Sequence, residues 1–501
     1  MLSQYKRLGK HTLVYGLGTG ITSLIGAMLL PVYTRFLTPD DYGVLEMISV
    51  SSTILTGLLP LGVNMAAFRF TLYDSAEDVE RQRVILSTAH FFVIGATICV
   101  VAPLLLASPG VAAWLLGDAA YAPLVALSLV SVVLQSAIVI PMAKLRIDEN
   151  SSLFAVVNIA RFLVSLAFTI YFVVALKQGV YGIMVAGVLT SIPFALFFLF
   201  IALRWLKYEF SPPLLWKMLA FGIPLLTLTL SSTILNVADR FFLKQFSDLE
   251  QLGLYSVGYR IGQFIMLPVA ALQTAWPAVM FSIAKTSSAR KFFSSFLTYY
   301  LLGFTFLGLA LSVLAKEFIE VFTSQSFFSA YHIVPVIVLS YIFYGLYFVT
   351  AIGVNIEKKT QYLTLTVGGS AIVHLLLNAL IIPRYGQMGA AVSTLVSFAL
   401  MALSSALISL RFYFIPYEYT RIAKIVVAAL IVYAASSIWQ GNGLLISVLL
   451  KLVLLSCFPV ILYIAGVFSE HELAVAKEAV RDTLSGWYRS LRSWGKDSSS
   501  G

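Results

Sequence analysis

The chain has 501 residues, of which 59% are hydrophobic and only 11% are charged. A typical soluble domain carries about 25% charged residues, so the composition nearly excludes a soluble protein. The formal net charge of +10 raises the question of whether nucleic acid or membrane topology explains the excess of basic residues.

Apolar stretches of mostly 20 to 25 residues recur along the whole chain. A bilayer core about 30 Å thick needs about 20 apolar residues per helix, and the stretches are too long for barrel strands. We therefore expect an all-α polytopic membrane protein with about 14 transmembrane helices. The expected spans are 12–35, 43–68, 85–107, 122–143, 152–176, 181–203, 217–237, 254–281, 292–315, 331–354, 362–382, 389–412, 421–439 and 444–467.

The basic residues are divided unequally between the two faces that these spans define. The face that carries both termini holds 24 of the 33 Lys and Arg residues, the opposite face holds 6, and 3 lie inside helices. This asymmetry repeats loop after loop and follows the positive-inside rule. It predicts that both termini are cytoplasmic, so topology explains the net charge and no nucleic-acid partner is needed.

Two pairs of segments indicate an internal repeat. Residues 15–36, YGLGTGITSLIGAMLLPVYTRF, align with residues 221–242, FGIPLLTLTLSSTILNVADRFF, at an offset of 205 to 206. Residues 178–187 align with 385–394, and two glycines match there at an offset of 207. A nearly constant offset predicts that helices 1–6 repeat as helices 7–12 in the same orientation, with the substrate path between the repeats.

The repeat gives the expected domain organisation. Residues 1–210 form an N-terminal six-helix bundle, 211–415 a C-terminal six-helix bundle, and 416–467 two additional helices. Residues 468–501 begin with a capping box, Ser469 with Glu472, and continue as a cytoplasmic amphipathic helix and tail; a partly ordered basic tail is the alternative.

The segments PVYTRFLTPDDYGVLE and DRFFLKQFSDLEQLGLYSVGYRIG resemble those of the polysaccharide-transport family, within the multidrug/oligosaccharidyl-lipid/polysaccharide exporter superfamily. The resemblance covers residues 5 to 467. It implies two bundles in a V, a central cavity lined mainly by helices 1, 2, 7 and 8, and alternating access. It also implies a flippase, with no catalytic residues, that carries undecaprenyl-pyrophosphate-linked oligosaccharide across the bacterial inner membrane for O-antigen, lipopolysaccharide, capsule or exopolysaccharide biosynthesis.

Charged residues inside membrane helices are functional candidates by default, and arginine offers a planar fork that suits phosphate oxygens. Arg260 is expected about one and a half to two turns into helix 8. Its alternative is snorkelling to the outer interface. The substrate-binding candidates are Arg260, Arg240, Arg35, Arg69 and Arg161.

The other four arginines also have simpler interpretations. Arg35 and Arg69 could snorkel from helix ends. Arg240 could be held by Asp239, and Arg161 could pair within its own bundle. The acidic residues Asp239, Asp248 and Glu250 are expected in a loop at the outer mouth, where they would repel a phosphate. Tyr255 and Tyr259 could stack on sugar rings, although packing is the commoner role.

Several other polar residues lie in apolar runs. The possible coupling or cavity residues are Glu46, Asp239, Asn64, Asn236 and His374. Glu46 could hold a coupling ion, H⁺ or Na⁺, or pair with a nearby Arg. His374 and Asn378 lie one turn apart, and a hydrogen bond between helices is favoured there over a proton relay. Both cysteines lie in apolar runs, and the sequence has no metal-ligand spacing and no nucleotide-binding P-loop, so no cofactor is expected.

Three rival functions are weighed. A cation-coupled multidrug antiporter of the same fold would need carboxylates inside its bundles, and helix 1 has none. A membrane glycan polymerase or ligase would need a large outer loop, and none is found. A lipid II flippase would share the basic cavity and stays open. Membrane lipids are expected partners, and a polysaccharide polymerase and a chain-length regulator are further possible ones.

The unequal distribution of basic residues makes a prediction about topology. A C-terminal green-fluorescent fusion should fluoresce and a C-terminal alkaline phosphatase fusion should be inactive, because both termini are expected in the cytoplasm. The opposite pattern, an active phosphatase with a dark fluorescent fusion, would show that the assignment of the two faces is inverted.

Overall fold

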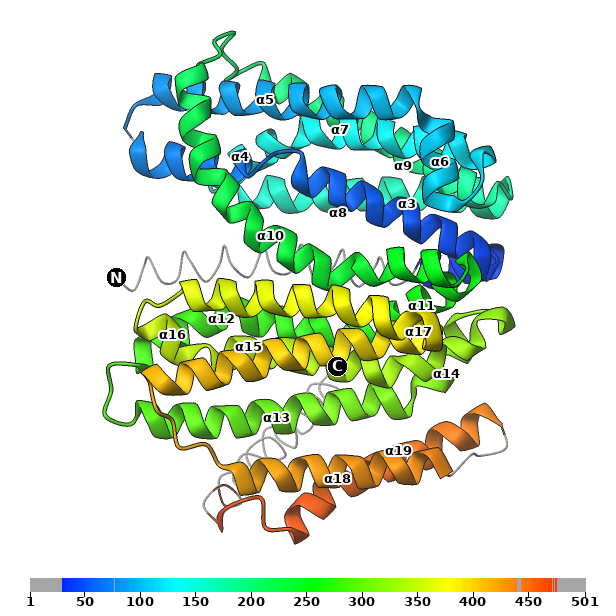
Figure 1. The fold of residues 1–501 in the computed structure, drawn as a ribbon, viewed down its shortest axis with the longest axis vertical. Coiled ribbons are helices and arrows are strands. Elements are labelled where there is room, and N and C mark those ends of the chain that lie inside the picture. The colour runs from blue at the N-terminus through cyan, green and yellow to red at the C-terminus, as the bar shows by residue number, and fades with distance from the viewer. Residues whose placement is uncertain (1–28, 76, 439–442, 471, 473, 475–501) are drawn as a thin grey trace, which may run out of the picture. The chain divides into compact units, whose positions relative to one another are not determined.

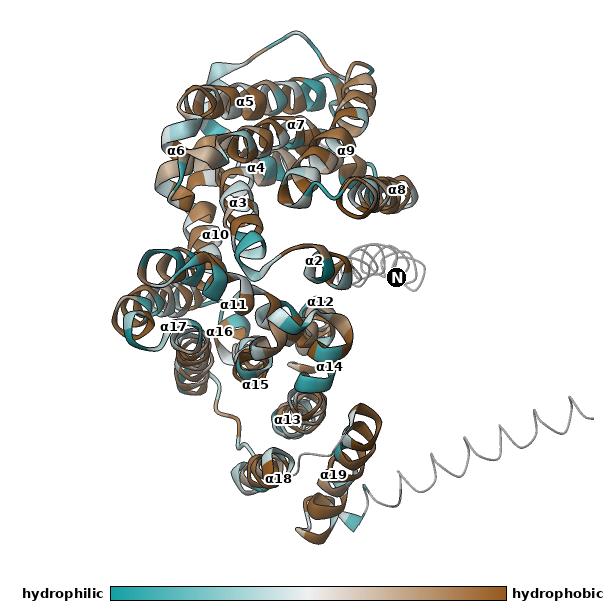
Figure 2. Cartoon of the chain, turned by 90° about the vertical axis from the view of Figure 1, so that its right-hand side faces the viewer, coloured by the Kyte–Doolittle hydropathy of each residue, from teal (hydrophilic) through white to brown (hydrophobic). Residues whose placement is uncertain are grey.

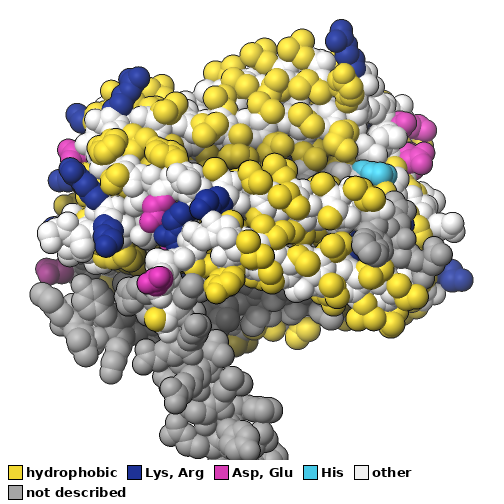
Figure 3. Space-filling view, turned by 90° about the horizontal axis from the view of Figure 1, so that it is seen from below, with side chains coloured by type: hydrophobic (Ala, Val, Ile, Leu, Met, Phe, Trp, Pro, Cys, Tyr) yellow, Lys and Arg dark blue, Asp and Glu magenta, His cyan; other side chains and the backbone are white. Residues whose placement is uncertain are grey.

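The computed structural model describes the whole chain except residues 1–28, 76, 439–442, 471, 473 and 475–501. The described residues form helices joined by short connections, and they contain no β-strand (Figure 1). Most of the ribbon is apolar in Figure 2. On the face seen in Figure 3, hydrophobic side chains cover most of the surface and charged side chains gather toward two opposite edges. The predicted all-α polytopic membrane fold is confirmed.

The number of spans agrees with the sequence. In the described part of the chain, 11 helices are long and apolar enough to cross a membrane, or 12 if the bent pair Pro39–Leu58 and Val63–Asp74 counts as one span. Helix α17, Gln361–Phe412, has 52 residues and a non-helical conformation at Gly386, so it covers two expected spans. The expected first span, 12–35, lies mostly outside the described residues.

The chain forms two compact units. One contains Met1–Ala289 and Ala315–Phe414, and the other contains Arg290–Leu314 and Ile415–Gly501. The predicted domain boundaries near residues 210 and 415 concern the repeat and stay a prediction.

The first half of the larger unit is built from short-loop helix pairs. Helix α7 packs against α5 and α9, and α8 packs against α9. A cluster of Ile138, Leu145, Val157, Ala195 and Phe198 joins α7, α8 and α9. The elements are α2 (Leu30–Phe36), α3 (Pro39–Leu58), α4 (Val63–Arg69), η1 (Phe70–Asp74), α5 (Val79–Leu106), α6 (Ser108–Leu116), η2 (Ala119–Tyr121), α7 (Ala122–Ile147), α8 (Ser151–Thr169), η3 (Ile170–Ala175) and α9 (Gly179–Ala202).

The second half of the larger unit is organised around α17, which packs along both α10 and α15 (Figure 1). One short 3-10 segment, η4, interrupts the span Leu249–Ile283, and another, η5, begins the span Gln325–Ile356. The elements are α10 (Pro212–Phe246), α11 (Leu249–Gly262), η4 (Gln263–Ile265), α12 (Met266–Ile283), α14 (Ala315–Phe322), η5 (Gln325–Ile333), α15 (Val334–Thr350), α16 (Ile352–Ile356) and α17.

Helix α10 belongs to both halves of this unit. Its first turns, with Met218 and Leu219, are buried in a cluster with Val63 of α4 and Ile85 of α5, and its later turns run along α17 (Figure 1). Pro224 lies inside the helix at the transition, where a missing backbone N–H weakens the helix locally.

Matched glycines support the predicted repeat. Gly179 and Gly386, which align in sequence, have φ angles of 55° and 51°. This left-handed conformation is unfavourable for residues with a Cβ. The two glycines therefore meet the same backbone requirement at equivalent places, where the sixth and twelfth expected helices begin.

A second matched pair lies where α3 crosses α11. A Cβ on Gly43 would lie 2.0 Å from the carbonyl oxygen of Leu249, and a Cβ on Gly253 would lie 1.9 Å from that of Pro39. Each glycine thus contacts the backbone of the other helix, which only a residue without a side chain permits. The aligned glycines form one reciprocal crossing.

The smaller unit combines α13 (Ala289–Val313), α18 (Tyr419–Ile438) and α19 (Leu444–Ile464). Leu309, Ile425, Val432 and Phe458 belong to its apolar cluster. At one end Arg421 donates to Glu418 at 3.0 Å and to Glu472 at 2.8 Å.

The predicted capping box after α19 is confirmed. Glu472 Oε2 accepts from the Ser469 N–H at 2.6 Å, and Ser469 Oγ accepts from the Glu472 N–H at 3.3 Å. Burial acts to raise the pKa of Glu472, but hydrogen bonds from Tyr299, Ser469 and Arg421 outweigh it and lower this pKa to about 2. The amphipathic helix predicted beyond it lies almost entirely outside the described residues.

The reciprocal glycine crossing makes a prediction about stability. Gly43→Ala should lower the melting temperature of the purified protein by several degrees, because overpacking against a backbone carbonyl costs about 1–3 kcal/mol. The matched control is Gly57→Ala in the same helix, where a Cβ would meet nothing within 4 Å. Equal melting temperatures for the two variants would contradict the crossing.

Candidate functional site

An ion pair is buried in the middle of the larger unit, on α10. Asp239 is 0% exposed and Arg240 is 4% exposed. Asp239 Oδ1 accepts from the Arg240 side chain at 2.7 Å and from the Arg240 backbone N–H at 3.0 Å. The guanidinium also donates to the carbonyl oxygen of Asn236 at 2.6 Å. The side chain of Arg240 is therefore fixed by its own helix.

Tyrosines complete the surroundings of this pair. The Tyr255 hydroxyl donates to the second oxygen of Asp239, and Arg240 lies 4.0 Å from the centroid of the Tyr259 ring. Tyr259 shares a hydrogen bond of 2.8 Å with Tyr341, which accepts another from Gln263 at 2.9 Å. Tyr255 and Tyr259 are buried, so the idea that they stack on sugar rings is wrong for this conformation.

Glu46 on α3 connects the two halves of the repeat. One carboxylate oxygen lies 3.5 Å from Arg240 Nε, and the other lies 3.7 Å from an Nη of Arg260 on α11. The Glu46 side chain is only 12% exposed, so burial strengthens these attractions. Of the two interpretations of Glu46, the structure supports the ion pair with a nearby Arg.

Arg260 is the cation of this cluster that remains accessible. Its side chain is 36% exposed, against 5% for that of Arg240. Its guanidinium lies 5.7 Å from the Tyr42 ring and interacts electrostatically with Tyr42 and Tyr33. The Tyr42 hydroxyl is buried and has no hydrogen-bond partner among the described residues. Arg260 is thus a positively charged side chain that solvent can reach and that lies near Tyr42.

Two expectations about the joint between helices 7 and 8 are wrong. Asp239 lies inside α10, which continues to Phe246, and Glu250 lies in the first turn of α11, so neither is a loop residue. Arg260 lies about three turns into α11, since the helix begins at Leu249 after Asp248 caps it. Ion pairing and helix capping explain both errors. They allow charged residues to lie within a helix, whereas hydropathy alone ends α10 too early and begins α11 too late.

The other arginines do not join this cluster. Arg35 is exposed at the end of α2. The Arg69 guanidinium lies 4.5 Å from the Phe221 ring centroid, and Phe221 precedes Arg240 by about 28 Å of helix α10. Arg161 is half-buried in α8. Substrate binding by these three residues stays a prediction.

The polar residues proposed as coupling or cavity residues lie at different places in the structure. His374 Nδ1 lies 3.2 Å from Ser397 Oγ, across the break in α17 at Gly386, which agrees with the expected hydrogen bond between helices. Asn378 is buried one turn further along, and neither of its amide atoms has a described partner. Asn236 donates to Ser232, while Asn64 is half-buried near the start of α4.

Tyr42 is the residue of this site that sequence reasoning missed. It stands directly before Gly43 in one of the two segments that carry the repeat, and that position places it at the crossing. A tyrosine in a membrane helix is usually assigned to packing or to the interface, so its type gave no signal.

Solved structures share this fold. A lipid II flippase, MurJ, in an inward closed conformation, is 16% identical with a TM-score of 0.67, and the match covers 91% of this chain and 99% of that one. A multidrug resistance MATE transporter of the MOP superfamily, in an inward-facing conformation, is 15% identical with a TM-score of 0.60, covering 81% and 98%. Comparison with curated proteins gave no match.

The helices, their spans and these similarities define a multi-pass membrane protein with the fold of the MOP superfamily transporters. Residues 8–284, more than half of the chain, match the family described as "Polysaccharide biosynthesis protein". The chain belongs to this family.

The buried ion pair of Asp239 and Arg240 on α10 predicts an effect on protein stability, separate from any effect on substrate binding. Asp239→Ala should lower the melting temperature and the amount of protein in the membrane, because breaking a buried ion pair costs about 3–5 kcal/mol. Replacing both charged residues with apolar ones, in Asp239→Leu with Arg240→Met, should recover part of the lost stability. If Asp239→Ala is as stable and abundant as the unchanged protein, the pair has no structural role.

Proposed function

We propose that this protein is a flippase that moves undecaprenyl-pyrophosphate-linked oligosaccharide across the bacterial inner membrane by alternating access. The proposal depends on one observation. Arg260, an accessible arginine within a membrane span, faces a single carboxylate from the other half of the repeat.

The chemistry of the headgroup fits this arrangement. A pyrophosphate carries at least two negative charges, and one Arg at about 4 Å contributes roughly 4 kcal/mol at an effective dielectric constant near 20. The guanidinium of Arg260 can give two parallel hydrogen bonds to phosphate oxygens. The Tyr42 hydroxyl near it is buried without a partner in this conformation, and we propose that it donates a further hydrogen bond once Glu46 is displaced.

Glu46 occupies the place that the anion would take. It pairs with Arg260 and Arg240, and a pyrophosphate that approaches Arg260 would be repelled by it. We therefore propose that the substrate displaces Glu46 from Arg260. Since this ion pair joins α3 to α11, its exchange would loosen the crossing of the two helices when the substrate binds.

Arg240 has a supporting role in this proposal. Its guanidinium is held by Asp239, Asn236 and the tyrosine rings, so it contributes positive potential without moving. Arg35, Arg69 and Arg161 are proposed to act at other stages of the substrate's path. A polymerase and a chain-length regulator remain proposed partners, and H⁺ or Na⁺ the proposed driving ion.

The experiment replaces Arg260 in the native host and measures surface glycan, with the amount of protein in the membrane as the control. Arg260→Ala should abolish export at unchanged abundance, and Arg260→Lys should restore part of it, because charge returns without the planar fork. Arg260→Glu should be worse than Arg260→Ala, since repulsion is added to the lost attraction.

Binding of the purified protein to the lipid-linked oligosaccharide tests the same proposal directly. Arg260→Ala should weaken binding about 10- to 100-fold, the range expected for hydrogen bonds to a charged group. Glu46→Gln should tighten binding but slow export, because the competing carboxylate and the link between the helices are lost together. Normal export by both Arg260→Ala and Arg260→Glu would refute the cationic site.

A further inference from the structure

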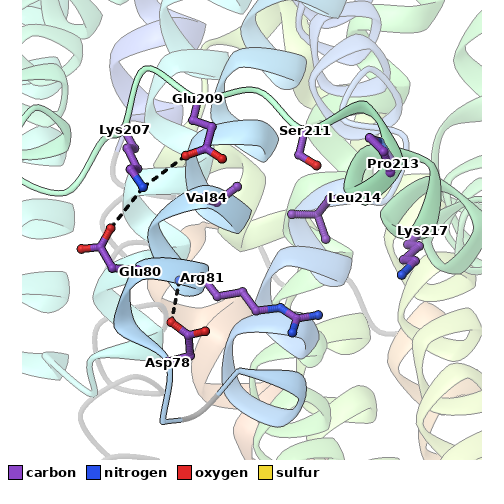
Figure 4. Close-up of a pocket in the computed structure, with 10 residues that line it drawn as sticks. All are labelled: Asp78, Glu80, Arg81, Val84, Lys207, Glu209, Ser211, Pro213, Leu214 and Lys217. Atoms are coloured by element: carbon purple, nitrogen blue, oxygen red, sulfur yellow. Dashed lines mark hydrogen bonds and ion pairs between the residues drawn. The ribbon is translucent and has the colours of Figure 1, made fainter.

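A second charged site lies at the opposite end of α10. The starts of α5 and α10 and the segment before α10 line an open pocket of about 400 Å³ (Figure 4). Its charged lining residues are Asp78, Glu80, Arg81, Lys207, Glu209 and Lys217. Lys217 and Arg240 are separated by about 35 Å of helix, so this pocket is distinct from the site at Arg260.

The three carboxylates of the pocket are already engaged. Asp78 caps α5 and accepts from the Arg81 backbone N–H at 2.9 Å. Glu209 and Glu80 lie 3.2 and 3.3 Å from the ammonium of Lys207. Hydrogen bonds to Glu209 and then Glu80 raise the pKa of Lys207. Glu80 also lies 3.2 Å from Arg83, so the charges of Glu80 and Glu209 are balanced by Lys207 and Arg83.

Two cations remain. Figure 4 shows the guanidinium of Arg81 and the ammonium of Lys217 extending from different helices toward the same space. Among the described residues, neither side-chain head has an anionic partner. Like charges that converge repel one another, so an anion between them would stabilise this arrangement.

The surroundings place the pocket at the depth of lipid headgroups. Trp216, next to Lys217, is 71% exposed, and Tyr208, next to Lys207, is 88% exposed. Exposed Trp and Tyr at the ends of membrane helices occupy the interface between hydrocarbon and water. The predicted topology puts these helix ends at the cytoplasmic leaflet, where acidic lipids attract basic residues.

We propose that this pocket binds the phosphate headgroup of an acidic phospholipid of the cytoplasmic leaflet, held between Arg81 and Lys217. The phosphodiester accepts hydrogen bonds from both cations, and the acyl chains remain in the bilayer beside the apolar start of α10. A bound lipid would link α5 to α10 where the first turns of α10 pack on α4 and α5.

The test measures the melting temperature of the full-length protein in a non-ionic detergent while phosphatidylglycerol is added. We expect a saturable rise that phosphatidylcholine does not give. The double variant Arg81→Gln with Lys217→Gln should need about 30-fold more phosphatidylglycerol for the same rise, since each basic residue contributes roughly a factor of five. Arg81→Lys should keep most of the effect.

Two comparisons make the result specific. The control variant Lys358→Gln with Lys359→Gln removes two exposed charges from the same predicted face and should respond like the unchanged protein. Glycerol 3-phosphate at the same concentrations should give no rise, because it lacks acyl chains. The proposal is overturned if the pocket variant keeps the full response, if the control variant loses it equally, or if the soluble phosphate replaces the lipid.

Discussion

A charged side chain inside a membrane span needs a counter-ion, and this requirement organises the centre of the larger unit. Glu46, Asp239, Arg240 and Arg260 form a set of two negative and two positive charges within the described structure. The set is neutral as it stands. The proposed substrate, with two negative charges, would bring the net charge to about −2, and displacement of one carboxylate would reduce this to −1. Glu46 is the carboxylate without a further hydrogen bond to hold it in place.

The ion pair and the glycine crossing form one interface. Glu46 follows Gly43 by three positions in α3, and Arg260 follows Gly253 by seven positions in α11. Residues three and seven apart share a helix face, so the face that touches the other helix through glycine also carries the charge. The backbone contact sets the distance between the helices, and that distance lets Glu46 reach Arg260.

Much of this fold is visible in the sequence, because long apolar spans and the distribution of basic residues follow directly from the bilayer. The repeat is visible too, through Gly43 with Gly253 and Gly179 with Gly386. Hydropathy does not show whether each charged residue is buried, paired or exposed. The pairing of Arg240 with Asp239 is an alternative that the sequence offers, but hydropathy still places Asp239 in a loop. The contacts of this pair with Tyr255 and Tyr259, which make it compatible with a buried helix, are three-dimensional.

The two halves of the repeat have diverged where they meet. In the alignment that pairs Gly43 with Gly253, Glu46 stands opposite Ser256, and Arg260 stands opposite Val50. The N-terminal copy therefore supplies only the acid at the crossing, and the C-terminal copy supplies only the base. A symmetric pair of acids or of bases would repel across the crossing. Dividing the charges holds the two copies together and, in the proposed mechanism, leaves one arginine whose partner an incoming anion replaces.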